Sequence, residues 1–237
     1  MLRSPAHLLC ALALVPALAV GACGGDDDSS GGGGGGDSGG ATAPSSQRAG
    51  ECKQVAQPDP KPNGGAKRPT QALDAGATYD VVLQTNCGDI TIRLDQKASP
   101  RTAASFASLA RSGFFDDTVF HRIVPGFVVQ GGDPTGTGTG GPGYSTRDVP
   151  PRGTTYTKGV VAMAKTGAEP PGTAGSQFYI VTAPDAGLPP EYALLGKVVK
   201  GQAVVDTIGK LGDPASGEAG TPLQPVVIER AAVREHR

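Results

Sequence analysis

Glycine and proline interrupt this sequence so often that only short helices and strands fit between them. The 237 residues include 37 glycines and 21 prolines, about twice the average share. From Thr78 onward, most of the intervening segments alternate apolar with polar side chains, which is typical of strands with one buried face. Many short strands with turn-rich connections favour a mainly β domain, either a closed antiparallel barrel or a sandwich.

The clearest elements lie at the start of this domain. Residues 78–95 alternate around a turn at Cys87, which predicts a β-hairpin. Ser99 is then a suitable N-cap, Pro100 suits the first helical position, and Gly113 is placed to end the helix. Further strands are expected at 119–124, 127–130, 159–164, 177–182, 194–199 and 226–230, with a second helix at 203–210.

The first 22 residues have the features of an export signal. Arg3 is basic, and the apolar segment from Leu8 to Val20 is too short to span a membrane comfortably. The small residues before Cys23 resemble the lipobox of bacterial lipoproteins, in which the cysteine receives a diacylglycerol and becomes the first residue. We therefore expect residues 1–22 to be a lipoprotein signal peptide and Cys23 to be lipidated. The alternative is an ordinary signal peptide with an incidental cysteine.

Two further segments separate this signal from the β domain. Residues 23–50 contain an aspartate run and a glycine run but no large apolar side chain, so we expect a disordered tether. The run Asp26–Asp28 lacks the spacing of a calcium loop, which favours a solvating role. Residues 51–77 form a proline-rich arm.

Cysteine usage is consistent with an exported chain. Of the four cysteines, Cys10 leaves with the signal and Cys23 carries the lipid, which leaves Cys52 and Cys87. In an oxidising compartment these two form a disulfide most simply, although two free thiols remain the alternative. Their spacing does not fit a metal site, and the three histidines complete no cluster with them.

Several function classes are excluded at this stage. The formal net charge of −1 gives no basic face for nucleic acid. The glycine-rich segment 133–151 lacks the Gly-Lys-Ser/Thr of a P-loop, and its prolines forbid the helix of a dinucleotide-binding fingerprint. Ser176 lies in no Gly-x-Ser-x-Gly motif, which argues against a hydrolase. No later apolar run approaches the length of a membrane span, so a multi-pass protein is excluded.

Three blocks carry a resemblance to a known family. They are FHRIVPGFVVQGGD at 120–133, GVVAMA at 159–164 with GSQFYI at 175–180, and LLGKV at 194–198. In this order and spacing they resemble the cyclophilins, a family of peptidyl-prolyl cis-trans isomerases, and the signal and tether resemble exported bacterial lipoprotein members. The resemblance implies a closed eight-stranded antiparallel β-barrel capped by two α-helices, over residues 78–232. It implies no cofactor and no metal.

The resemblance also implies roles for individual residues. Arg122 matches the catalytic arginine, Phe127 the aromatic floor of the proline pocket, and Gln130 the glutamine that orients the arginine and the substrate. His121 is expected to be structural, and Phe178 to face the core. The expected substrate-binding residues are Val128, Ala164, Lys165, Gln177, Tyr179, Leu188 and Tyr192.

Rotation about an X–Pro bond explains these residue types. The barrier of about 18–20 kcal/mol comes from amide resonance, and no covalent bond breaks, so neither nucleophile nor metal is required. A twisted amide nitrogen gains a lone pair that a fixed arginine can bind, mainly in the transition state. We expect a monomer that acts on unfolded or flexible proline-containing chains at the outer face of the cell membrane and assists the folding of exported proteins.

Departures from the family pattern leave an alternative open. Lys165 stands where asparagine is common, Gly187 where tryptophan is common, and Tyr192 where many eukaryotic members have histidine. The missing tryptophan predicts weak inhibition by cyclosporin. The alternative function is a proline-peptide-binding chaperone or clamp with little turnover. A structural surface protein is a third, less supported class.

Overall fold

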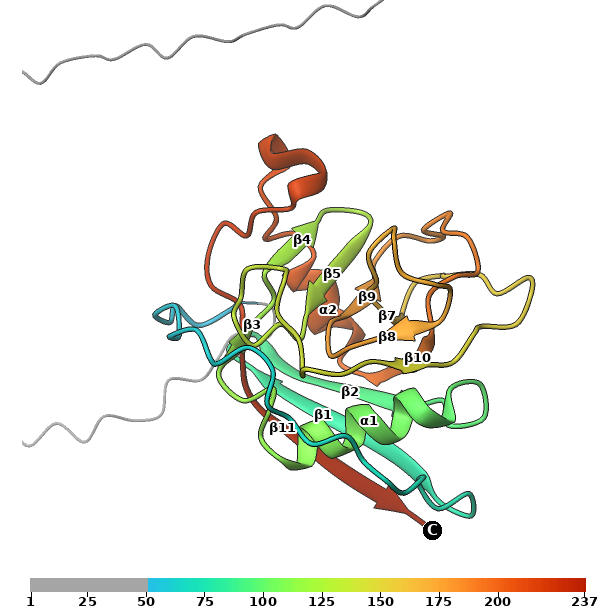
Figure 1. Cartoon of the computed structure of the whole chain (residues 1–237). Helices are drawn as coiled ribbons and strands as arrows, with labels where there is room; N and C mark the ends of the chain where they lie inside the picture. Colours follow the sequence, from blue (N-terminus) through green and yellow to red (C-terminus); the bar gives the residue numbers. More distant parts are fainter. Residues whose placement is uncertain (1–50) are drawn as a thin grey trace, which may run out of the picture. The chain divides into compact units, whose positions relative to one another are not determined.

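The predicted hairpin forms two inner strands of the largest sheet. In the computed structural model, which describes residues 51–237, β1 (Thr78–Thr85) and β2 (Gly88–Leu94) pair antiparallel with Leu83 opposite Ile90. The apolar side chains of one face are fully buried, because this sheet curves around the hydrophobic core (Figure 1). The alternation read from the sequence therefore corresponds to one core-facing side of each strand.

Helix α1 (Pro100–Arg111) covers this core. The ring of Phe106 lies 4.6 Å from that of Phe115 and 5.3 Å from that of Phe178, measured between ring centroids. Ser99 occupies the N-cap position as predicted, but its hydroxyl makes no capping hydrogen bond. The carboxylate of Asp148 instead accepts a 2.7 Å hydrogen bond from the backbone N–H of Thr102, so a distant loop caps the helix.

Nine strands form one sheet in the order β3-β11-β1-β2-β10-β7-β9-β5-β4, and β6 pairs with β8 separately. Every ladder is antiparallel, as predicted for a mainly β domain. The remaining bounds are β3 Thr118–Val119, β4 Arg122–Val124, β5 Val128–Gly131, β6 Thr146–Arg147, β7 Val160–Met163, β8 Thr173–Ala174, β9 Phe178–Val181, β10 Leu194–Lys200 and β11 Val227–His236.

The expected closure into an eight-stranded barrel is not confirmed. The run predicted as one strand at 119–124 is divided: β3 pairs with β11, whereas β4 pairs with β5. Phe120 and His121 separate the two short strands, and the ladders leave β3 and β4 as the two edges of the sheet. The bridge between Val119 and Asp133 is an isolated one, so the sheet remains a partial barrel in the described residues.

The second predicted helix is present as α2 (Gln202–Ile208), and a short 3-10 helix, η1 (Pro214–Ala219), follows it. The last strand ends at His236, six residues beyond the predicted end. A cross-strand group explains its length: Asp80 of β1 binds Arg93 of β2 at 2.9 Å and His236 of β11 at 3.0 Å. These partners come from three strands, which local periodicity does not reveal.

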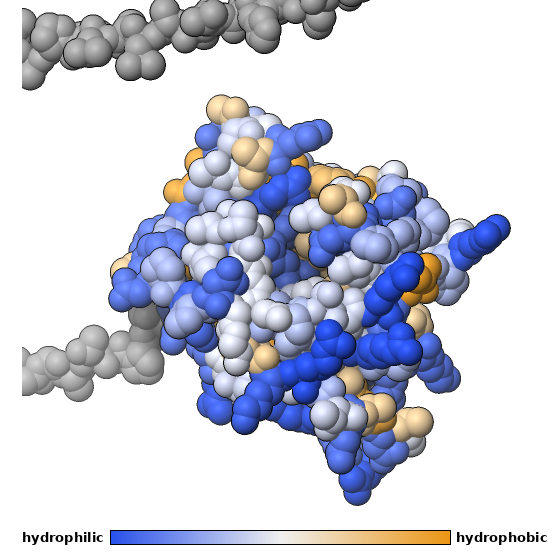
Figure 2. All heavy atoms as spheres, viewed as in Figure 1, coloured by the Kyte–Doolittle hydropathy of each residue, from blue (hydrophilic) through white to orange (hydrophobic). Residues whose placement is uncertain are grey.

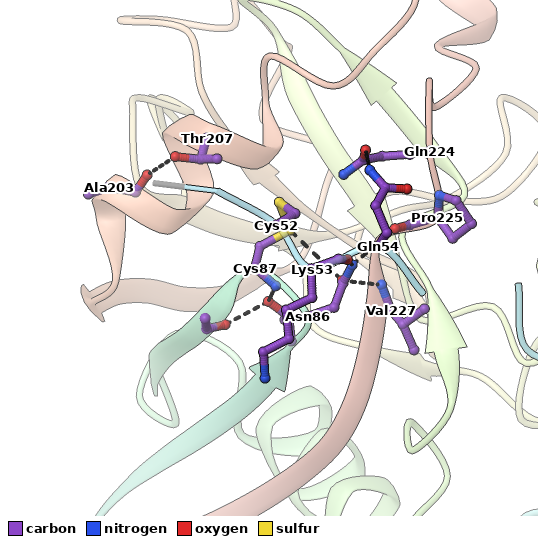
Figure 3. Close-up of a disulfide and its surroundings, with 12 residues drawn as sticks. Cys52, Lys53, Gln54, Asn86, Cys87, Ala203, Thr207, Gln224, Pro225 and Val227 are labelled. Carbon is purple, nitrogen blue, oxygen red and sulfur yellow. Dashed lines mark hydrogen bonds between the residues drawn. A yellow bond between two sulfur atoms is a disulfide. The ribbon is translucent and has the colours of Figure 1, made fainter. Parts of the chain in front are cut away.

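The arm (residues 51–77) has no regular secondary structure, and a disulfide fixes its start. The sulfur atoms of Cys52 and Cys87 are bonded, which joins the arm to the β1–β2 turn (Figure 3). Beside this bond, Asn86 is fully buried, donates to the carbonyls of Lys53 and Pro225, and accepts from the N–H of Val227. One asparagine thus ties the arm, the turn and β11 together.

Within residues 51–237, no helix is long and apolar enough to cross a membrane. The predicted signal peptide, the predicted lipidation site at Cys23 and the predicted tether to residue 50 lie outside the described residues.

Candidate active site

Strand register brings the principal candidate residues into one row. Arg122 of β4 lies opposite Gln130 of β5, Gln130 lies opposite Tyr179 of β9, and Tyr179 lies opposite Ala162 of β7. Directly paired residues share one face of a sheet, so the four side chains follow one another across the same surface. Phe178 falls in the alternate row and belongs to the central core, as expected from its position next to Tyr179.

The polar part of this row is a chain of side-chain hydrogen bonds. Arg122 Nη1 donates to Gln130 Oε1 at 3.2 Å, and Gln130 Nε2 donates to Gln177 Oε1 at 3.0 Å. Gln177 Nε2 in turn donates to the carbonyls of Gly138 and Gly140, each at 2.9 Å. We call Arg122, Gln130 and Gln177 the polar strip. Each amide has both a donor and an acceptor in use, so the orientation of every member is fixed.

Arg122 is held from a second direction that the sequence did not indicate. Its Nε donates to the carbonyl of Glu218 in η1 at 2.9 Å. Gly220 follows η1 with a φ of 64°, and a Cβ there would approach the Arg122 side chain to 2.9 Å. A glycine is therefore required at this turn both for its backbone conformation and for the close packing against Arg122. The guanidinium keeps unused N–H groups on its other edge.

An apolar cluster lies beside the polar strip. The guanidinium carbon of Arg122 is 6.0 Å from the centre of the Phe127 ring. Phe127 packs with a small cluster that is separate from the main core. This cluster includes the other predicted apolar groove residues, namely Val128, Ala164, Tyr179, Leu188 and Tyr192. The fold thus gathers residues from positions 127 to 192 into one surface.

Tyr156 is a member of this cluster that the sequence analysis did not identify. It is fully buried, and its hydroxyl donates to the carbonyl of Tyr192 at 2.6 Å and accepts from the N–H of the same residue at 3.0 Å. Burial raises the pKa of Tyr156 to about 12, so the hydroxyl keeps its proton. The rings of Tyr156, Tyr179 and Tyr192 lie 5.7–6.4 Å apart. No local motif marks Tyr156, because its partners lie 23 and 36 residues away.

Tyr179 and Lys165 differ in how their polar groups are accommodated. The hydroxyl of Tyr179 is buried without a hydrogen-bond partner in the described structure, and burial raises its pKa. The Lys165 side chain is only 4% exposed, and its ammonium lies 3.1 Å from the carboxylate of Glu191. Lys165 also lines the groove, so the part that it presents there is mainly backbone. This arrangement is compatible with the expected backbone contact to a bound chain.

A glycine-rich loop (residues 133–143) borders the polar strip. The buried Asp133 carboxylate accepts hydrogen bonds from the N–H groups of Thr135, Gly138 and Gly140. Burial opposes ionisation of this carboxyl, but these hydrogen bonds outweigh it and lower the pKa of Asp133. Asp133 therefore organises the loop whose carbonyls hold Gln177.

The loop and the strip together enclose a cleft of about 400 Å³. Its lining includes Gln130, Gln177, Gly138, Ala164 and Lys165. Figure 2 shows this face of the molecule hollowed beside the pale surface of the glycine-rich loop. We take this cleft, with the adjoining apolar cluster, as the candidate active site and call it the catalytic groove.

His121 lies next to Arg122 but has no partner for general acid–base work. Both of its ring nitrogens are buried and lack a hydrogen bond in the described structure, and burial lowers its pKa. Residues 51–237 also contain no cluster of three His, Cys, Asp or Glu side chains that would hold a metal ion. The groove offers a fixed guanidinium beside an apolar cluster, which suits a reaction without proton transfer or covalent intermediates.

Comparison with known proteins agrees with this chemistry. Residues 80–233 match the family model for "cyclophilin type peptidyl-prolyl cis-trans isomerase". A peptidyl-prolyl cis-trans isomerase-like 1 from Gibberella zeae is 38% identical over 162 residues, covering 67% of this chain and 96% of the relative. Peptidyl-prolyl cis-trans isomerase B from Streptomyces anulatus is 40% identical over 170 residues, covering 64% and 94%.

Solved structures give the same result for the fold. A cyclophilin-type isomerase from Cryptosporidium parvum superposes with a TM-score of 0.59 and 32% sequence identity, covering 66% of this chain and 98% of that one. A second structure of that protein, in the presence of the dipeptide Ala-Pro, gives a TM-score of 0.58 with 31% identity, covering 65% and 98%. The matched family model, the relatives and the groove geometry lead to one conclusion: this chain belongs to the cyclophilin-type peptidyl-prolyl cis-trans isomerases.

Proposed function

We propose that this isomerase is tethered to the outer face of the cell membrane, where it accelerates proline isomerisation in exported chains. The observation that carries the catalytic part is the fixed Arg122 guanidinium beside the apolar cluster around Phe127, which forms the proline pocket in this proposal. Uncatalysed exchange takes tens to hundreds of seconds, which is slow enough to limit folding. A chain that leaves the export machinery unfolded would therefore be a suitable substrate.

In the proposed mechanism the pocket holds the proline ring and Arg122 binds the twisted amide. Rotation removes amide resonance and leaves a lone pair on the nitrogen, to which an unused guanidinium N–H donates. Gln130 and the Glu218 carbonyl hold the guanidinium in place before the substrate arrives, so little reorganisation is needed. The apolar cluster excludes water, which strengthens this hydrogen bond. The substrate-binding roles of Val128, Ala164, Lys165, Gln177, Tyr179, Leu188 and Tyr192 belong to the same proposal.

Two features support the proposed location. The sequence before Cys23 has the small residues of a lipobox, and Cys52 and Cys87 are joined by a disulfide, which is typical of proteins outside the cytoplasm. Diacylglycerol on Cys23 would anchor the chain, and the tether would let the domain reach its clients. We also propose that the protein works as a monomer.

Membrane fractionation tests the location. In cells that express the protein, labelled fatty acid should enter the wild type and the isomerase should sediment with membranes. The Cys23→Ser variant should lose the label and appear in soluble fractions, with its isomerase activity retained. Label in the Cys23→Ser variant, or membrane association that does not depend on Cys23, would contradict the proposed anchor. A light-scattering mass of the domain in solution tests the monomer, and a dimer mass would overturn it.

A further inference from the structure

A second cleft lies outside the catalytic groove and has a strongly basic lining. It has a volume of about 680 Å³ and is formed by the arm, the start of α1 and the segments around β6 and β8. Three arginines line it, Arg68 of the arm, Arg101 of α1 and Arg147 of β6, against the single carboxylate of Glu169. We call this feature the arginine cleft. The chemistry of the isomerase reaction makes no use of these residues.

The arginine cleft is continuous with the catalytic groove. Ser145 and Glu169 line both, and Tyr144 of the groove lies under the guanidinium of Arg68 at 5.3 Å. A peptide whose proline occupies the proposed proline pocket can therefore continue past the glycine-rich loop into the arginine cleft. The residues that arrive there are a few positions from the proline along the client chain.

The guanidinium groups are placed in advance by backbone carbonyls. Arg68 Nη2 donates to the carbonyl of Ser145 at 2.6 Å, and Arg147 Nε donates to that of Pro171 at 3.1 Å. Arg101 Nη1 lies 3.4 Å from the carbonyl of Arg147. Each guanidinium has five N–H donors, so most of them remain available to a ligand. All three residues are exposed, which leaves their charge open to an incoming chain.

The nearest carboxylates accept hydrogen bonds from other groups and do not neutralise the three arginines. One oxygen of Glu169 accepts from the N–H and the hydroxyl of Thr166. The Asp148 carboxylate is buried and accepts from Thr102 at the start of α1. The helix terminus is thus already capped, and the attraction for an anion comes from the arginines. Carboxylates bind arginine in charge-assisted, often bidentate hydrogen bonds.

One wall of the arginine cleft belongs to a part of the chain outside the family domain. Residues 68–72 contribute to the lining, whereas the family model begins at residue 80. The arm is held against the domain by the Cys52–Cys87 disulfide and by hydrogen bonds from Gly64 and Ala66 to the glycine-rich loop. The position of this wall is therefore fixed, as a selective binding surface requires.

We propose that the arginine cleft binds acidic side chains that flank the proline of the client, so that this isomerase prefers clients with an acidic segment near the X–Pro bond. The proposal rests on the isomerase activity of the adjoining groove and adds a substrate preference to it. Charge attraction of this kind lowers KM for acidic peptides and weakens as salt screens it.

Three peptides with the same Ala-Pro centre test the preference by exchange NMR. One carries three glutamates before the Ala-Pro unit, one carries them after it, and one carries glutamines at both places. At low salt, one acidic peptide should have a KM about fivefold lower than the glutamine peptide, with a similar kcat. The ratio should approach one at 0.5 M salt. Equal KM values for all three peptides would overturn the proposal.

A charge-reversal variant locates the effect. Arg101→Glu removes one cleft charge, and glutamate is favourable in the first turn of α1, so the helix should persist. This variant should abolish or reverse the KM ratio between acidic and glutamine peptides. Arg152→Glu makes the same charge change at an exposed arginine outside the cleft and should keep the ratio. An equal loss in both variants would mean that net charge, rather than the arginine cleft, sets the preference.

The design separates this proposal from the activity on which it rests. If the wild type exchanges the glutamine peptide but shows no acidic preference, only the arginine cleft proposal fails. If no peptide is exchanged, the isomerase assignment itself fails.

Discussion

The polar strip and the arm both contact the glycine-rich loop, but different forces hold them. Arg122 and Gln130 lie in the register of paired strands, and Gln177 directly precedes β9. The arm has no strand or helix. It is held by one disulfide, by the packing of Ala66 and Leu73 against the core, and by hydrogen bonds outside any ladder, such as those from the Lys61 ammonium to three carbonyls. The comparison indicates that strand pairing fixes the orientation of the side chains in the polar strip. We expect loss of the arm's attachment to lower the free energy of unfolding while leaving kcat nearly unchanged.

The largest expected effect concerns rate alone. Arg122→Ala should lower kcat/KM for an Ala-Pro peptide by about 10²–10³-fold, because a preorganised donor to the transition state is lost. Its half-buried side chain contributes little to the core, so the melting temperature should change only slightly. Exchange rates and thermal unfolding of both proteins measure the two quantities. Turnover at the wild-type rate would show that another group stabilises the twisted amide.

The disulfide should show the opposite pattern. Replacing Cys52 and Cys87 together by serine opens a closed loop of 35 residues, which should lower the free energy of unfolding by about 3–4 kcal/mol. Below the melting temperature, kcat should stay close to the wild-type value. Urea titration and isomerase assays at low temperature provide the test. A parallel loss of kcat would mean that the arm supports catalysis directly.

Asp133 should link stability to pH. Asp133→Asn should lower the free energy of unfolding at pH 7 by about 1–3 kcal/mol, because the loop N–H groups lose their charged acceptor. The pKa of Asp133 is lowered in the folded state, so the wild-type advantage is fully present above the ordinary value of 3.8. It should disappear as the pH falls through the lower folded value. Unfolding curves from pH 7 to pH 3 would measure this, and a constant difference would contradict it.

Gln177 should give the smallest effect, because it links the polar strip to the glycine-rich loop without touching the reacting amide in the proposed mechanism. Gln177→Ala removes the hydrogen bonds to Gln130 and to the carbonyls of Gly138 and Gly140. We expect kcat to fall about fivefold, the equivalent of one hydrogen bond. A Gln177→Glu variant keeps the acceptor toward Gln130 and should recover part of the rate. No change in kcat would mean that Gln130 and the Glu218 carbonyl orient Arg122 without help from Gln177.

Local patterns predicted the elements whose partners are close in sequence. The β1–β2 hairpin and α1 follow from alternation, a proline at N1 and a terminating glycine. The candidate groove residues were predicted from the resemblance to the family, and strand register places Arg122, Gln130 and Tyr179 in one row.

Other features depend on partners far along the chain. The Glu218 carbonyl that holds Arg122 is 96 residues away, and Tyr156 is fixed by Tyr192, 36 residues away. The division of residues 119–124 into β3 and β4 has the same origin, because β3 pairs with β11 and β4 pairs with β5. Sequence periodicity contains no information about such contacts, so the partial barrel and the full shape of the pocket required the structure.

Two-dimensional exchange NMR of an Ala-Pro peptide with catalytic amounts of the protein tests the central claim most directly. The claim is that the catalytic groove turns over X–Pro bonds. It predicts cross-peaks between the cis and trans forms at mixing times much shorter than the uncatalysed exchange of tens to hundreds of seconds. Shifted peptide resonances without cross-peaks would show a clamp that binds proline without isomerising it, and would contradict the account.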